Sequence, residues 1–336
     1  MNTRYDIFGC LVALMGVMLG LYGCTDELEG VGNHTRPSDV ICFTASLKDS
    51  RTTSVSRSAS GCLEMEEEEW LVGVETEQGA SRGTPVTLLD GTAGVIGYAY
   101  DTWGTGITPW SSLYNVQFNF DGDELTAAED NDVRWNTMVK TANGYIDNVR
   151  FYLYAPHNLT GGKLSDKNTG GTPTLNYTVN ENVKLQDDLI VASWQGSKGT
   201  NYGIDTKTGK VIQPQSIPLS FEHVLTGVKF KVGFPCKVIS LLVQEVYNSG
   251  TYTFGGNWSV KNTGENIKSD YTFNFGNKVG DTYTGQEFSS NAVLTDGENT
   301  LLMIPQEFPT DATAEIVLTY KNNNGELQTK RYPLAG

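Results

Sequence analysis

Basic charge, histidine and cysteine are all scarce in this chain, and each shortage excludes a class of function. The 336 residues include 24 Lys and Arg against 39 Asp and Glu, which gives a formal net charge of −15. A surface of this charge repels phosphate backbones, so nucleic acid is excluded as a partner. The five cysteines include no CxxC pair, which argues against a zinc site and against a disulfide framework.

Three of the cysteines, Cys42, Cys62 and Cys236, lie beyond the first 24 residues. Cysteines that are odd in number and scattered along the chain usually remain free thiols, which behave as small, buried, apolar residues. We expect that role for them, and one disulfide is the alternative.

Catalytic motifs are also missing. The three histidines, His34, His157 and His223, are far apart, and none lies in HExxH or beside a nucleophile motif such as GxSxG. We therefore expect no enzyme, no catalytic residue and no cofactor, and we interpret His223 as a structural hydrogen-bonding residue. The sequence does not exclude a glycosidase-type pair of carboxylates, because the distance between the two groups is defined only in the folded protein.

The acidic run Asp121–Asp132 invites comparison with the calcium-binding EF-hand pattern. It departs from that pattern at Leu125 and Thr126, where an oxygen ligand and a glycine are required. We interpret the run as a surface loop and expect no metal site.

A sustained hydrophobic run is found at the N-terminus. Ile7–Tyr22 contains glycines and is short for a bilayer core, which needs about 20 apolar residues, so a spanning helix is the weaker interpretation. The run leads to Leu21-Tyr22-Gly23-Cys24, which resembles a lipobox. We predict that residues 1–23 are a lipoprotein signal peptide and that Cys24 is acylated. An ordinary secretory signal is the alternative.

The segment after Cys24 divides into a tether, a strand and a loop. Residues 24–38 lack apolar periodicity and are expected to be a flexible tether. Asp39–Ser46 is apolar on both faces, which predicts a strand that is central in a sheet or covered by another layer. The following Ser- and Thr-rich segment holds Arg51 and Arg57 and is expected to be an exposed loop, open to a trypsin-like protease.

The rest of the chain favours short antiparallel strands. Alternation with period two and no sustained helical period predicts an all-β fold without long helices. A polar, Gly-containing segment at Trp194–Gln215 indicates a boundary, so we expect two β-sandwich domains, 39–205 and 206–336. The expected strands are Thr92–Tyr100, Tyr114–Phe120, Val149–Tyr154, Thr174–Val179, Leu189–Ser193, Val228–Val232, Val238–Val243, Thr251–Phe254, Tyr271–Phe275, Leu301–Ile304, Ala314–Tyr320 and Leu327–Tyr332.

Several blocks together carry a family resemblance. They are Phe151–Pro156, Gln186–Ala192, Pro218–Leu225, Val246–Tyr252 with Trp258, and Leu302–Gln306. In their order and spacing they resemble the fimbrillin-like lipoproteins, the type V pilins of the Bacteroidales. The resemblance implies two tandem transthyretin-like antiparallel β-sandwiches, export as a lipoprotein to the surface of the cell outer membrane, and assembly into a fimbrium that supports adhesion.

The resemblance also implies a maturation step. In that family an arginine-specific cut follows the first strand, and removal of the strand leaves a groove that a neighbouring subunit fills. The matching strand here is Asp39–Ser46, and the implied cut site is Arg51, with Arg57 as the alternative. The implied partners are other pilin subunits, the outer membrane through the lipid on Cys24, and a host or bacterial surface receptor.

One departure concerns the C-terminus. Family members continue past a Pro-Leu-Ala-Gly-like segment with a strand that supplies the donor in stalk subunits, whereas this sequence stops at Gly336. We expect either a truncated sequence or a subunit that does not donate in this way and sits at one end of a fibre or as an anchor.

A surface glycan-binding lipoprotein is the competing hypothesis. Trp103, Trp110 and Trp135 lie near Gly- and Asp-rich loops, where indole rings stack on sugars. The alternative is that they pack under loops or fill the core.

Overall fold

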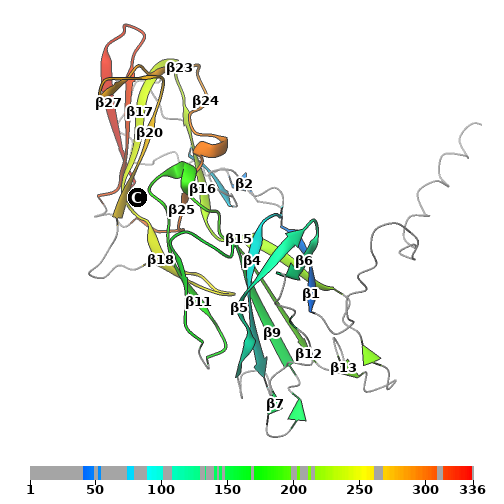
Figure 1. Ribbon diagram of the computed structural model, residues 1–336. Helices are drawn as coiled ribbons and strands as arrows, with labels where there is room; N and C mark the ends of the chain where they lie inside the picture. Colours follow the sequence, from blue (N-terminus) through cyan, green and yellow to red (C-terminus); the bar gives the residue numbers. More distant parts are fainter. Residues whose placement is uncertain are drawn as a thin grey trace, which may run out of the picture. The chain divides into compact units, whose positions relative to one another are not determined.

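The protein is built almost entirely of β-strands in the residues that the structure describes. This computed structural model describes residues 41–48, 52–53, 74–78, 89–100, 108–128, 133, 140–141, 144–145, 148–167, 170–197, 203–204, 211–212, 216–260, 268–308 and 313–334 (Figure 1). Within these ranges the helical elements are single 3-10 turns, η2 (Val183–Leu185) and η3 (Gly297–Asn299). The predicted all-β class is confirmed.

Strands from both halves of the chain close into a barrel in the order β1-β15-β12-β9-β4-β5-β6. Its pairings are antiparallel except for β1 with β15, which run parallel. The strands are β1 (Cys42–Leu47), β4 (Thr92–Tyr100), β5 (Thr108–Asp121), β6 (Glu124–Ala127), β9 (Asn148–Ala155), β12 (Ile190–Ser197) and β15 (Ile217–His223).

The barrel interior is filled by the alternate side chains of these strands. On β9, Val149, Phe151 and Leu153 are fully buried in one apolar cluster, which also includes Phe221 of β15 and Trp110 of β5. Successive side chains of a strand point to opposite faces, so this alternation places every second residue inside. The predicted alternation at Val149–Tyr154 is confirmed.

The outer face of β4 and β9 is buried as well. Tyr98, Tyr100, Tyr152 and Tyr154 point away from the barrel interior and pack in a second cluster with strands from the C-terminal half. Phe254 lies 5.8 Å from Tyr152, measured between ring centroids. Burial on both faces explains why β4 is apolar or glycine at nearly every position.

The remaining strands form several smaller sheets. Figure 1 shows β17 beside β20, with which it pairs, and β27 belongs to the same sheet through its pairing with β26. The sheet β2-β3-β16-β24 with β25 consists of β2 (Thr52–Thr53), β3 (Val74–Gln78), β16 (Thr226–Val232), β24 (Ala292–Val293) and β25 (Leu301–Met303). The sheet β20-β17-β26-β27 with β23 consists of β17 (Cys236–Tyr247), β20 (Lys268–Asn274), β23 (Gln286–Phe288), β26 (Glu315–Lys321) and β27 (Leu327–Pro333).

A four-stranded sheet and three hairpins complete the described strands. The sheet β10-β11-β18-β19 consists of β10 (Gly162–Leu164), β11 (Thr174–Thr178), β18 (Ser249–Thr253) and β19 (Trp258–Val260). The hairpins are β7 (Lys140–Thr141) with β8 (Gly144–Tyr145), β13 (Gly203–Ile204) with β14 (Val211–Ile212), and β21 (Lys278–Val279) with β22 (Thr282–Tyr283).

The strand β15 lies beyond the boundary expected between residues 205 and 206. The expected bounds assign Ile217–His223 to the second domain, 206–336, whereas in the structure this strand pairs with β1 and β12 in the barrel. The division at 205 and 206 stays a prediction, and the chain after it contributes one strand to the barrel.

The expectation of a surface loop over Asp121–Asp132 was wrong for Glu124–Ala127. These residues form β6, which pairs with β5 and with β1. Leu125, the residue that broke the calcium-binding pattern, is fully buried in the barrel interior. Ala127 also packs against this core cluster, and the backbone of β6 has a strand partner on each side.

The buried tyrosines predict a loss of stability in alkaline solution. Burial raises the pKa of Tyr154 and of Tyr252 to about 12, and it raises the pKa of Tyr177 and Tyr271 further. Because the folded pKa lies above the unfolded value near ~10, this stability is complete below that pH and is lost as pH rises through the folded pKa values. We expect the free energy of unfolding, measured in urea, to fall steeply above pH ~10.

Tyr154→Phe provides the control for this prediction. The Tyr154 hydroxyl donates to Asn115 Oδ1 at 2.6 Å, so the variant loses a hydrogen bond at neutral pH and also part of the alkaline decrease. Tyrosinate absorbance that rises near pH ~10 with no loss of stability would contradict the assignment.

Candidate functional site

Several residues that the sequence singled out lie outside the described part of the chain. They are Cys24, His34, Arg51, Arg57, Cys62, Trp103 and Trp135. The signal peptide, the tether, the lipidation site and the cleavage site therefore stay predictions. What the structure does describe is β1, the strand that the resemblance marks as removable.

Both edges of β1 are paired. Residues Phe43–Leu47 run parallel to Ile217–Phe221 of β15, and Cys42–Thr44 run antiparallel to Glu124–Thr126 of β6. Further backbone hydrogen bonds hold its ends: the Ile41 amide donates to the Val133 carbonyl at 2.8 Å. Figure 1 shows β1 beside β6 in the barrel wall. The predicted central position of this strand is confirmed.

One face of β1 belongs to the barrel core. Ile41 and Phe43 are fully buried and Ala45 is 3% exposed. The Phe43 ring lies 5.5 Å from the rings of Phe118 and Phe151, between centroids, in edge-to-face geometry. Such pairs add to the free energy gained from burying the apolar area itself.

The other face of β1 is turned to solvent. Thr44 and Ser46 are exposed and Cys42 is half-buried. The Ser46 hydroxyl donates to the Leu219 carbonyl at 3.1 Å, and the Lys48 ammonium lies 2.7 Å from the Glu222 carboxylate in an exposed pair. Exposed pairs contribute little. The strand is therefore held by its backbone pairing and by its inward side chains, whereas Thr44 and Ser46 remain exposed.

The chain leaves the barrel immediately after β1. The Lys48 amide still donates to the Phe221 carbonyl of β15 at 2.9 Å. Thr52 and Thr53 already form β2, which pairs with β3, and β3 pairs with β16. Residues 49–51, with Arg51 last, thus connect the barrel strand to a different sheet. We call the space between β6 and β15 that β1 fills the β1 groove.

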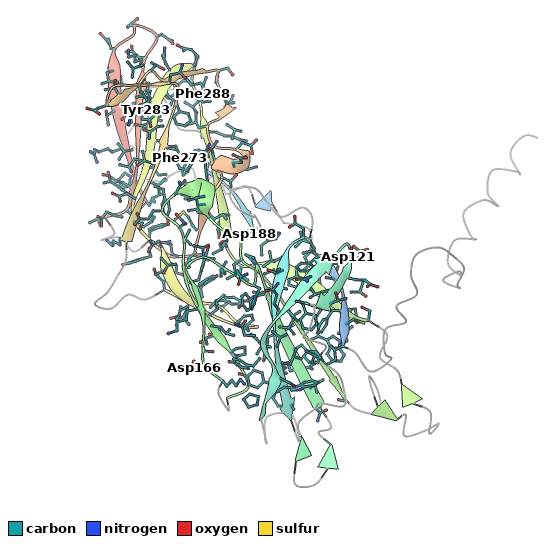
Figure 2. All side chains as sticks on the ribbon, viewed as in Figure 1. Asp121, Asp166, Asp188, Phe273, Tyr283 and Phe288 are labelled. Atoms are coloured by element: carbon teal, nitrogen blue, oxygen red, sulfur yellow. The ribbon has the colours of Figure 1, made fainter. Side chains whose placement is uncertain are left out.

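A buried polar pair, His223 with Asp188, lies at the C-terminal end of β15. His223 Nδ1 lies 2.6 Å from Asp188 Oδ2, and the two side chains are 4% and 0% exposed. Figure 2 labels Asp188. Neighbouring Gln186, also fully buried, accepts from the Leu302 amide at 2.8 Å. The structural role predicted for His223 is confirmed. A pair this enclosed has no open face for a substrate, so it does not form an accessible acid–base site.

The described tryptophan of the glycan-binding hypothesis lies in the core. Trp110 is 1% exposed and packs against Phe151, with 6.1 Å between ring centroids. The alternative that it fills the core is confirmed, and this indole is not a platform for a sugar.

The two described cysteines differ in burial. Cys236 is buried, which raises the pKa of its thiol to about 11 and agrees with the predicted apolar role. Cys42 is half-buried on the outward face of β1, so the burial expected for it was wrong. Its position follows from the strand period, which turns Ile41 and Phe43 inward.

In the described ranges of the chain, no group of three or more His, Cys, Asp or Glu is placed to hold a metal ion. Within the same ranges, no helix has the length and apolar character needed to cross a bilayer.

Comparison with known proteins gives distant structural likeness. No protein-family model matches the chain, and no curated protein matches it. A candidate cell adhesion protein from Bacteroides ovatus superposes with a TM-score of 0.45 and 12% identity, covering 90% of this chain and 88% of that chain. Another, from Bacteroides uniformis, gives 0.38 and 15%, covering 75% and 82%. At these values the likeness supports no inference about activity or partners, so the function proposed below rests on this chain's own residues.

Proposed function

We propose that this protein is a structural subunit of a surface fimbrium. It is exported as a lipoprotein acylated at Cys24, cut after Arg51, and assembled by exchange of β1 for a strand of a neighbouring subunit, in support of adhesion. The observation that carries the proposal is the position of β1, which is a complete barrel wall strand with a short connection behind it.

The connection between β1 and β2 supports a cut at Arg51. Removing the chain up to Arg51 takes away β1 and leaves Thr52 as the first residue. Because β2 is already paired with β3 in another sheet, the remaining chain keeps its strand pairing on the far side of the cut. The barrel alone loses a strand.

The groove left behind is suited to another strand. β6 and β15 would each present unpaired backbone groups, and unpaired edges recruit strands from other chains. Burial of two large side chains such as Ile41 and Phe43 contributes about 3–6 kcal/mol before ordering costs. The backbone pairs add to this, so an inserted strand would dissociate slowly.

The geometry of β1 also defines the incoming strand. It must run parallel to β15 and antiparallel to β6, with apolar side chains at the positions of Ile41 and Phe43 and a small one at Ala45. In the chain's own edge strand β27, by contrast, Lys330 and Arg331 are consecutive, so each alternate set of side chains includes a charge. We therefore infer that β27 is not the donor strand and that another segment supplies it.

N-terminal sequencing of the protein recovered from surface fibres tests the proposal. We expect the sequence to begin at Thr52. An acylated, blocked N-terminus at Cys24 in the polymer, with β1 retained, would refute assembly by strand exchange while leaving surface anchoring intact.

A further inference from the structure

The strand β20 lies at one edge of the sheet β20-β17-β26-β27. Figure 1 shows it beside β17, with which it pairs on one side. In the part of the chain that the structure describes, no strand pairs with its other side. An edge strand presents a row of N–H and C=O groups that can pair with another chain. The outer side of β20 is therefore a candidate interaction surface.

The register of β20 identifies the backbone groups that point outward. In an antiparallel pair, residues that hydrogen-bond to the partner strand alternate with residues whose N–H and C=O point away from it. The Phe275 amide, one residue beyond β20, donates to the Ile239 carbonyl of β17 at 3.0 Å. Counting back by two gives the residues of β20 that bond to β17, and the residues between them turn outward. These are Asp270, Thr272 and Asn274, which we call the β20 edge.

The charged side chains of β20 are turned back toward β17. Lys268 Nζ lies 3.0 Å from Glu245 Oε2, and Asp270 Oδ1 accepts from the Glu245 amide at 3.0 Å. A lysine that projects past an edge strand blocks pairing, but these contacts draw both charges to the neighbouring strand. The next exposed side chains, Thr272 and Asn274, are uncharged.

The opposite edge of the same sheet carries more protection. β27 contains Lys330, Arg331 and Pro333. Charged residues and proline are common means of preventing an edge strand from pairing, and proline also lacks the N–H that pairing needs. β20 has no proline, and its one lysine is held by Glu245. The sheet is therefore guarded at β27 and open to pairing at β20.

We propose that the β20 edge pairs with the β20 edge of a second copy of this chain, antiparallel about a two-fold axis at Thr272. This register sets Thr272 opposite Thr272 and Asp270 opposite Asn274 of the other copy. All three residues turn their backbone groups outward, so the strands can exchange N–H···O bonds at each position. Asp270 Oδ2 can also accept from the Asn274 amide nitrogen of the other copy. An axis at Asp270 would instead oppose two carboxylates, which is destabilising.

The contact is separate from the β1 groove and does not depend on strand exchange, since β20 and β1 belong to different sheets. A single pair of short strands buries less than the ~1,200 Å² of a stable interface, so we expect weak association in solution. Two chains with net charge −15 repel each other, and salt screens this repulsion. The association should therefore be tighter at high ionic strength.

Analytical ultracentrifugation of the full chain over a range of concentrations, in ~0.5 M salt, tests the contact. We expect a monomer–dimer equilibrium whose dissociation constant rises at least ~10-fold in Thr272→Pro, because proline removes the central N–H. The Thr272 amide does not bond to β17, so the fold should be kept, and thermal unfolding verifies this. A chain that stays monomeric, or a folded Thr272→Pro variant that associates as tightly as the unaltered chain, would overturn the proposal.

Thr329→Pro is the matched control. The Leu334 amide donates to the Ala314 carbonyl, so by the same alternation the Thr329 amide points outward from the other edge of the sheet, on β27. This variant should associate as the unaltered chain does. An equal weakening by the two proline substitutions would assign the association to a general effect on the sheet and refute pairing at β20.

Two further variants test the register. Asn274→Asp opposes two carboxylates without changing the backbone, and it should weaken association at least ~3-fold, whereas Asn323→Asp in the exposed turn after β26 should not. Thr272→Cys should give a disulfide-linked dimer on oxidation, because residues paired directly opposite each other lie about 5.5 Å apart between Cα atoms, within reach of a disulfide. Thr329→Cys should give no more dimer than the unaltered chain. Cross-linking of both cysteine variants, or of neither, would refute a two-fold axis at Thr272.

Discussion

Replacing Phe43 with alanine is expected to lower the free energy of unfolding by about 3–5 kcal/mol. Phe43 is fully buried, and its ring contacts Phe118 and Phe151 at 5.5 Å between centroids. Its neighbours belong to paired strands and therefore cannot collapse into the space that the ring leaves. Denaturant unfolding of the uncut chain measures the change.

Thr44→Ala is the matched control for this substitution. Thr44 lies next to Phe43 on the same strand but is exposed, so the change should be within about 0.5 kcal/mol. Equal effects of the two substitutions would mean that β1 does not occupy the barrel wall in solution. In the proposed polymer β1 has departed, so Phe43→Ala should destabilise the precursor and leave assembled fibres unchanged.

Many of the strands could be predicted from the sequence, because apolar and polar residues alternate where one face of a strand is buried. The predicted Thr92–Tyr100 coincides with β4, and Val149–Tyr154 lies within β9. Leu189–Ser193 was the start of β12, which continues to Ser197. The extension was hidden because its last residues are polar or glycine and resemble a linker.

The sheet partners were not accessible in the same way. Nothing local in Asp39–Ser46 specifies a parallel partner at Ile217–Phe221, far along the chain. β6 was missed because four residues with one buried leucine show no period. The pairing partners of such a strand are set by the tertiary structure of the barrel and not by the local sequence.

The contact between Arg150 and Gln195 shows a similar limit. Arg150 lies in the expected strand Val149–Tyr154, whereas Gln195 lies in the segment Trp194–Gln215 that was interpreted as a boundary. The pairing of β9 with β12 places the two residues opposite each other, and Arg150 Nη2 donates to Gln195 Oε1 at 2.6 Å. This contact depends on the register of the two strands, which the sequence of either strand alone does not specify.

Cleavage of the full chain by an arginine-specific protease is expected to convert β1 from a covalent strand into an exchangeable one. Arg51→Gln should block the productive cut, whereas Arg57→Gln should not. Because β1 keeps its backbone pairs and buried side chains, the cut product should retain it until a competing strand is supplied in excess. N-terminal sequencing and mass spectrometry of the cut protein identify the bond that is broken.

A synthetic peptide of residues 39–48 should then replace β1 in the cut protein. A labelled peptide should be incorporated, and a version with Phe43→Asp should bind at least ~100-fold more weakly, because a carboxylate in place of the ring loses about 1.5–3 kcal/mol of apolar burial and adds the cost of an unpaired buried charge. Uptake is measured by fluorescence anisotropy, with the uncut chain as control. The uncut chain should take up neither peptide, since its own strand fills the groove at a high effective concentration. Equal uptake of both peptides by the cut protein would show that the bound peptide does not enter the β1 groove, and strand exchange at this position would be excluded.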